Sequence, residues 1–299
     1  MVRRSATSGA RAHGVQPVAR RTLVAAVAAA GLLVAPGRTF VAVLGAGGRT
    51  GLECVEALRK KGEKVKALTR SGKWKPPAGR SEKGVETGVA DVTSYSSVKK
   101  ALAGATAVIW AAAFSRGKTT PAEVDNAGLV NTARAVKELG IERLVVVSSA
   151  ATTRPYAPVG ALLNLIGNGV LLEKEKGEKA MQGILDGTDS TWTILKPGGL
   201  KSDAGGGSML LEFNQGDTIV GSIPRADVAL VAATAATDPE NRGAGKTFEL
   251  YQAKGKSGLL PWYPTKSRYA VKGTSDVGAM LGRLLVDSEV TEVPGILPF

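Results

Sequence analysis

Cysteine and histidine are almost absent from this sequence. Its 299 residues include one cysteine, Cys54, and one histidine, His13. A single thiol excludes an internal disulfide and a zinc site built on thiolates. We expect His13 to lie in a segment that is removed, so the mature protein has no imidazole for a serine-type triad or a metal cluster. We therefore expect no metal, and assign any chemistry to Ser, Tyr, Lys, Arg, carboxylates, backbone amides or a cofactor.

Long apolar runs and aromatic residues are also scarce. The longest apolar run, residues 23–35, is 13 residues long, whereas a membrane-spanning helix needs about 20. The sequence therefore predicts no transmembrane span, although a peripheral contact with a membrane stays open. Aromatic residues make up 5% of the chain and do not alternate with its basic residues as they do in nucleic-acid modules, so we expect no nucleic-acid partner.

Acidic residues are missing from the first 38 positions. That segment holds six arginines, and Glu53 is the first acid. Removing the six charges from the net +13 leaves +7 for the remainder. A leader rich in Arg, Ser and Ala is typical of a transit peptide, so we expect a chloroplast protein, in the stroma or peripheral to the thylakoid or envelope. A mitochondrial address, the two-part signal of a complex plastid and twin-arginine export are the alternatives.

Short apolar runs alternate with segments of helical spacing after the leader. Such βαβ units predict an α/β protein with a Rossmann-type, doubly wound parallel sheet and helices on both faces. We expect a single domain at 39–252, followed by a C-terminal extension at 253–299. Trp262 and Tyr263 in that extension suggest either a docking surface or a cover for the sheet. The expected strands are 39–44, 65–68, 85–89, 107–111, 143–147, 191–195 and 246–251, and the expected helices are 52–62, 94–102, 124–139, 171–184, 225–237 and 276–286.

A glycine-rich turn joins the first strand to the first helix. Glycines stand at 45, 47, 48 and 51, and the spacing G-x-x-G-x-x-G fits Gly45, Gly48 and Gly51. Glycine permits a tight turn and lets a diphosphate approach the backbone, while the helix that follows directs its free amides at the phosphates. Because the turn lies between a strand and a helix, we expect Gly45, Gly47, Gly48, Arg49, Thr50 and Gly51 to bind a nicotinamide dinucleotide.

The end of the second strand bears on which dinucleotide binds. An NAD-preferring site usually has an acid there, whereas this strand ends at Arg70. Arg70, helped by Arg49, would pair with a 2′-phosphate, which favours NADP(H) over NAD(H). A solvated loop arginine is the plainer interpretation of Arg70. Asp91 and Val92 are expected at the adenine edge, although Asp91 equally suits the start of a helix.

The motifs recur in an order that is typical of a known family. The chain resembles the atypical short-chain dehydrogenase/reductases with an NAD(P)H-binding, NmrA-like domain, and is similar to plastid members related to an NADPH-binding subunit of the import translocon. The resemblance spans about residues 39–251 and includes the segment from Arg225 to Ala229. It implies that Ala111, Ala112, Ser148, Lys176, Pro197 and Gly198 also contact the cofactor. The matching segments are Gly45–Gly51, Arg70, Asp91–Val92, Val124–Asp125, Ser148–Ser149 and Lys196–Gly199.

The catalytic residues match the resemblance less well. Active members of the wider superfamily pair Tyr and Lys as Y-x-x-x-K on one helical face, where the lysine lowers the tyrosine pKa. Lys176 stands at the lysine position, but Leu172 replaces the tyrosine. Lys176, Ser149 and Ser148 are therefore the candidate catalytic residues, although Lys176 also fits a solvated face and both serines fit a strand cap. The Y-x-x-x-K at 95–99 falls between strands three and four, on the wrong helix.

Two functions follow from this pattern. One is a plastid NADPH-dependent oxidoreductase that transfers hydride to a small organic substrate. The other is a non-catalytic NADPH-binding redox sensor, or an assembly or regulatory factor of a plastid protein complex. The missing tyrosine favours the second, while the glycine turn and Lys176 are compatible with both.

Overall fold

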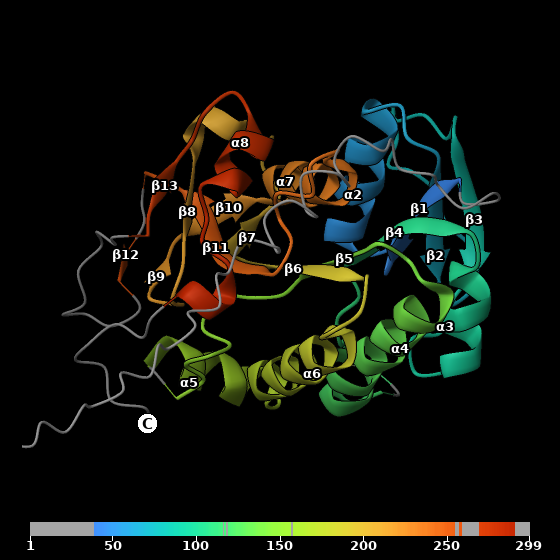
Figure 1. Ribbon diagram of the computed structural model, residues 1–299, viewed down its shortest axis with the longest axis horizontal. Coiled ribbons are helices and arrows are strands. Elements are labelled where there is room, and N and C mark those ends of the chain that lie inside the picture. Colours follow the sequence, from blue (N-terminus) through green and yellow to red (C-terminus); the bar gives the residue numbers. More distant parts are fainter. Residues whose placement is uncertain are drawn as a thin grey trace, which may run out of the picture. The chain divides into compact units, whose positions relative to one another are not determined.

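The apolar runs of the sequence form the strands of a mainly parallel sheet in the computed structural model (Figure 1). The structure describes residues 39–115, 117, 119–156, 158–254, 257–258 and 269–290. The strand order in the main sheet is β13-β8-β11-β6-β5-β4-β1-β2-β3. These strands are β1 (Phe40–Leu44), β2 (Val65–Thr69), β3 (Val85–Val89), β4 (Ala105–Trp110), β5 (Arg143–Val147), β6 (Thr191–Pro197), β8 (Leu211–Asn214), β11 (Lys246–Gln252) and β13 (Val271–Lys272).

Helices cover both faces of this sheet, which confirms the doubly wound Rossmann-type fold. Residues that alternate along β1 pack to opposite sides, Val41 and Val43 to one core and Ala42 and Leu44 to the other. The first core includes α2, α7 and α8, and the second includes α3, α4 and α6. The helices are α2 (Arg49–Lys60), α3 (Tyr95–Leu102), the π-helix η1 (Ala122–Gly128), α4 (Leu129–Leu139), α5 (Pro158–Ile166), α6 (Val170–Leu185), α7 (Arg225–Thr237) and α8 (Val277–Gly282).

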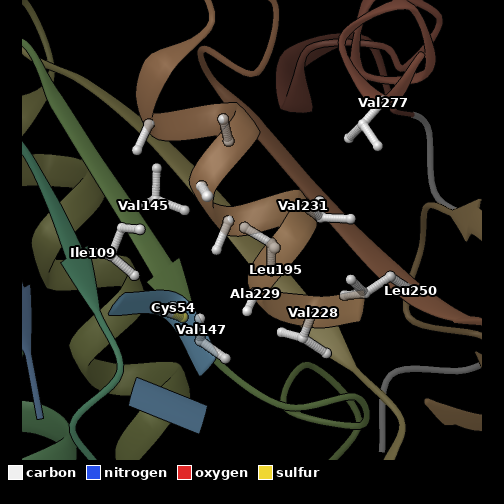
Figure 2. Close-up of a cluster of buried hydrophobic side chains, with 14 of the residues drawn as sticks. Cys54, Ile109, Val145, Val147, Leu195, Val228, Ala229, Val231, Leu250 and Val277 are labelled. Atoms are coloured by element: carbon white, nitrogen blue, oxygen red, sulfur yellow. The ribbon is translucent and has the colours of Figure 1, made fainter. Parts of the chain in front are cut away.

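The core under α2 and α7 joins distant parts of the chain. Figure 2 shows Cys54 of α2 close to the side chains of central strands and of α7. Cys54 is fully buried, and burial raises the pKa of its thiol to about 12. The cysteine is thus a small apolar residue of the core.

The segment after β6 contains short elements that the sequence analysis did not predict. They are β7 (Gly199–Lys201), paired with β10 (Ser222–Pro224), the 3-10 turn η2 (Ser208–Leu210) and β8. These strands are three or four residues long, so they carry too little alternation to be recognised. A second small pair joins β9 (Ile219–Val220) to β12 (Ser257–Gly258), and the last turn described is η3 (Asp287–Glu289).

Part of the expected C-terminal extension belongs to the main fold. β13 pairs antiparallel with β8, and Met280 and Leu284 at and beyond α8 are buried in the core. The expected leader at 1–38, Trp262 and Tyr263 lie outside the described residues. No helix in the described part of the chain combines the length and apolarity needed to cross a bilayer.

Candidate functional site

A cleft opens at the carboxyl edge of the sheet, where the strand order reverses between β1 and β4. This reversal is where ligands bind in open α/β sheets. The cleft has a volume of about 980 Å³. It is lined by Gly45, Gly47, Gly48, Arg49, Thr50, Thr69, Arg70, Ser71, Lys73, Ala90, Asp91, Val92, Thr93, Ala111, Ala112, Ala113, Phe114, Ser115, Thr119, Val124, Leu200 and Arg225.

The turn between β1 and α2 requires glycine at two positions, because a side chain there would collide with the backbone. Gly45 has a φ of +77°, and a Cβ there would lie 2.6 Å from the Cα of Ala112, two residues after β4. At Gly51 a Cβ would overlap the carbonyl oxygen of Gly45. Glycine at these two positions therefore lets the turn close against β4 and lets α2 start directly from it.

The start of α2 faces the cleft with its positive end. Gly48 is the N-cap and provides no side-chain hydrogen bond, and the first turn contains no acid. Gly48, Arg49 and Thr50 all line the cleft. A helix start of this kind directs its free N–H groups and the positive end of its dipole at an anion.

Positive side chains outnumber negative ones along the cleft. Arg49, Arg70, Lys73 and Arg225 line it, whereas Asp91 is the one acid among its lining residues. The Oδ1 atom of Asp91 accepts hydrogen bonds from the backbone N–H and the hydroxyl of Thr93, at 3.0 and 2.8 Å. None of the four cations forms an ion pair with an acid in the described ranges. The cleft is therefore suited to an anion.

The structure brings most of the predicted cofactor residues together. These are Gly45, Gly47, Gly48, Arg49, Thr50, Arg70, Asp91, Val92, Ala111 and Ala112. The other predicted cofactor residues do not line the cleft: Gly51, Ser148, Lys176, Pro197 and Gly198. The candidate catalytic residue Ser149 does not line it either. Gly198 instead lies where a Cβ would overlap the carbonyl oxygen of Gly221, and Ser149 donates to the Ala150 carbonyl at 3.1 Å.

Lys176 lies on the outer side of α6. Its side chain is 63% exposed, and its Nζ lies 2.6 Å from Oε1 of Glu173. The hydrogen bond to Glu173 raises the pKa of Lys176. In this conformation Lys176 pairs with its own helix rather than with the cleft.

Lys174 is the lysine of this helix that reaches the inside. It is 12% exposed, and its Nζ lies 2.7 Å from Oδ1 of the fully buried Asp125 side chain in η1. The other carboxylate oxygen of Asp125 accepts the backbone N–H of Phe114 at 2.9 Å. Because Phe114 lines the cleft, the Lys174–Asp125 pair holds one wall of the site in place.

Ser148 belongs to a buried polar network behind the cleft. Its hydroxyl donates to Oε1 of Glu178, and the other Glu178 oxygen lies 3.6 Å from Nζ of Lys196. The Lys196 side chain is 1% exposed and lies 3.7 Å from Oδ2 of Asp217. Burial alone would lower the pKa of Lys196, but the carboxylates of Glu178, Asp217 and Glu249 raise it.

The same network fixes the loop that follows β5. Asp217 accepts the backbone N–H groups of Ala151 and Thr153 at 2.7 and 2.8 Å. Ala151 has a φ of +69°, a backbone conformation that is unfavourable for residues other than glycine. Glu249 in turn accepts the backbone N–H of Asp217 at 2.8 Å, and burial raises the pKa of Glu249 to about 7. The network therefore supports the loop that carries Ser149.

Several cleft residues were not predicted from the sequence. Lys73 and Phe114 lie in loops without a motif, and Leu200 belongs to the short strand β7. Arg225 opens a segment that the resemblance singled out, but its place in the cleft depends on how α7 packs. No group of three or more His, Cys, Asp or Glu side chains within the described ranges is arranged to hold a metal ion.

Comparison with known proteins adds to this geometry. The sequence matches the profile of a family described as NAD(P)H-binding over residues 45–239. It is 35% identical, over 211 residues, to an uncharacterized chloroplastic protein of Arabidopsis thaliana. This match covers 67% of this chain and 73% of the relative.

Solved structures show the same fold. The oxidoreductase ylbE from Lactococcus lactis matches with a TM-score of 0.58 at 21% identity, covering 74% of this chain and 93% of that one. A short-chain dehydrogenase/reductase from Veillonella parvula, solved in complex with NADP, matches with a TM-score of 0.54 at 17% identity. That match covers 75% of this chain and 99% of the other.

Proposed function

This chain belongs to the NAD(P)H-binding family, and we propose that it is a plastid NADP(H)-dependent oxidoreductase. Its fold is also that of a solved short-chain dehydrogenase/reductase. The preference for NADP(H) over NAD(H) is carried by Arg70. This residue follows the end of β2 and lines the cleft, where an NAD site would have an acid for the ribose hydroxyls. A guanidinium suits a 2′-phosphate because it donates two parallel hydrogen bonds.

The rest of the dinucleotide follows from the geometry of the cleft. The diphosphate is assigned to the N–H groups at the start of α2, beside Gly48, Arg49 and Thr50. The adenine is assigned to Asp91 and Val92, and the nicotinamide to the residues that follow β4, near Phe114. When bound, the nicotinamide supplies or accepts a hydride. This chain's residues orient the ring and exclude water from it.

The plastid address is supported by two observations. The relative from Arabidopsis thaliana is chloroplastic by name, and the leader at 1–38 has the composition of a transit peptide.

The nucleotide preference is tested by titrating protein fluorescence with NADPH and NADH. We expect Arg70→Gln to raise the Kd for NADPH about 10- to 100-fold, the value of one charge-assisted hydrogen-bonding pair, and to leave the Kd for NADH within about 2-fold. Lys75→Gln is the matched control, because Lys75 is an exposed cation of the same loop that does not line the cleft. Equal losses for both dinucleotides would contradict the assignment of Arg70.

A non-catalytic NADPH sensor or assembly factor is the second candidate. It is favoured because Lys176 pairs with Glu173 and Ser148 donates to Glu178, so neither of these candidate groups lines the cleft. Consumption of NADPH with a panel of quinones and carbonyl compounds separates the two functions. Turnover of NADPH would exclude the non-catalytic sensor, and Lys176→Ala then tests whether Lys176 takes part; tight NADPH binding without turnover would exclude the enzyme.

A further inference from the structure

Arg225 reaches the cleft from a part of the chain far from the glycine turn. It is the first residue of α7, is 9% exposed and lines the cleft. Its Nη1 atom donates to the carbonyl oxygen of Leu200 and to the hydroxyl of Ser202, both at 3.2 Å. Both acceptors are neutral, so these bonds hold the side chain in place without balancing its charge.

The charged side chain whose field acts on Arg225 has the same sign. α7 packs against α2, and Figure 1 shows the two helices side by side. Arg225 and Arg49 are the first residues of these helices, and both line the cleft. Burial and the Arg49 guanidinium together lower the pKa of Arg225.

Other buried or partly buried cations in the described residues are differently placed. Lys174 and Lys196 form ion pairs with acids, and acids near Arg143 and Lys246 act to raise the pKa of each. For Arg225 the charge that shifts the pKa is another guanidinium, and it lowers that pKa. A buried cation beside a like charge is destabilised, and a bound anion removes that cost.

We propose that Arg225 and Arg49 form an anion subsite of the cleft, separate from Arg70, that binds an oxyanion such as a phosphate or a carboxylate. The proposal rests on the proposed function, because the same cleft holds the dinucleotide. The oxyanion comes either from the diphosphate of the dinucleotide or from an acidic group of the substrate. Arg225 donates to the Leu200 carbonyl oxygen, and Leu200 also lines the cleft, so an acidic substrate held here would lie beside an apolar residue.

The experiment is calorimetry on the full chain, with Arg225→Gln and Arg225→Lys beside the wild type. One arm titrates NADPH and NADH, and the other titrates inorganic pyrophosphate into protein saturated with NADPH. If the dinucleotide supplies the oxyanion, Arg225→Gln raises the Kd for NADPH and NADH alike, about 10- to 100-fold. If the substrate supplies it, both dinucleotide Kd values stay within about 2-fold and pyrophosphate binding is lost. Arg225→Lys keeps the charge and is expected to restore part of either loss.

Lys60→Gln is the matched control. Lys60 is the last residue of α2, at the end away from Arg49, and its side chain is 70% exposed. Lys60→Gln removes one positive charge, as Arg225→Gln does, but at a position that does not line the cleft, so both titrations should match the wild type. If Arg225→Gln does not fold, Arg49→Gln tests the same subsite from the other helix.

The proposal is overturned if Arg225→Gln and Arg49→Gln fold normally and change neither titration. Failure of the proposed function looks different, because the wild type then binds neither dinucleotide. Pyrophosphate titrated into the protein alone still tests the subsite in that case: binding that Arg225→Gln abolishes supports it, and binding that Arg225→Gln leaves unchanged overturns it.

Discussion

The cleft and the buried network behind it use charge in opposite ways. Along the cleft, Arg49, Arg70 and Arg225 have no ion pair with a described acid. Behind it, Lys196 lies between Glu178 and Asp217, with Glu249 close by. The two regions are adjacent in the fold but differ in whether the protein itself supplies the opposite charge.

The comparison separates charges that bind from charges that support. A buried ion pair is satisfied within the protein, so its loss should affect folding before it affects ligands. A cation in a cleft that has no counter-ion from the protein is stabilised when an anion binds beside it. Changes in the network should therefore alter stability, and changes in the cleft should alter binding.

The largest expected effect is the removal of the buried lysine. Lys196→Met leaves the surrounding carboxylates without their cation, which should destabilise the protein by about 3–5 kcal/mol and lower the melting temperature by roughly 10 °C. Thermal unfolding measures this directly. Lys179→Met is the control, because Lys179 is 71% exposed and paired on the surface of α6. A melting temperature unchanged by Lys196→Met would show that the network does not support the fold.

Gly51→Ala tests the cleft side of the comparison. The added Cβ would overlap the Gly45 carbonyl oxygen, so the turn must shift, at a cost of about 1–3 kcal/mol in stability and at least about 10-fold in NADPH affinity.

Gly62→Ala is the matched control for that change. Gly62 has a φ of +82° and no atom within 4 Å of a Cβ, so alanine there adds only backbone strain of about 1 kcal/mol. Its NADPH titration should match the wild type. Equal NADPH affinities for Gly51→Ala and Gly62→Ala would show that the tight turn is not needed for binding.

A smaller effect is expected from pH. Burial raises the pKa of Glu249 to about 7, above the 4.5 of a free carboxyl, so the folded state holds a proton that the unfolded state releases between these values. The free energy of unfolding should therefore fall by about 1–2 kcal/mol as the pH rises from about 5.5 to 8.5.

The same titration checks which group is responsible. Glu249 is faced by Asp217, Asn214, Thr218 and Lys196, and burial raises the pKa of Glu178 and Asp287 in the same direction. Urea unfolding across this range, with Glu249→Gln beside the wild type, measures the effect. A slope that Glu249→Gln leaves unchanged would assign the pH dependence to another group.

The fold was predictable from the sequence because its signal is local. Apolar runs of four to six residues alternate with helical spacing, and the glycine turn follows the first of them, which specifies the parallel half of the sheet. The short strands β7, β8 and β10 were missed because the segment is rich in glycine. The helix α5, which begins at Pro158, was also not predicted.

The site was predictable only where its residues are close in sequence. Gly45 to Thr50, Arg70 and Asp91 follow strand ends, and parallel strands bring those ends together. The family resemblance selected Lys176, but Lys174 is the lysine directed inward. Lys174 is two residues away and therefore on the opposite face of α6. Arg225 and Arg49 line the same cleft only because α7 packs on α2, which no local pattern encodes.

The most direct test of this account is a crystal structure of the protein with NADP. It should place the diphosphate within hydrogen-bonding distance, about 3 Å, of the backbone N–H groups at Arg49 and Thr50, with the 2′-phosphate against Arg70. A dinucleotide bound away from the glycine turn, or no dinucleotide at saturating concentration, would contradict it.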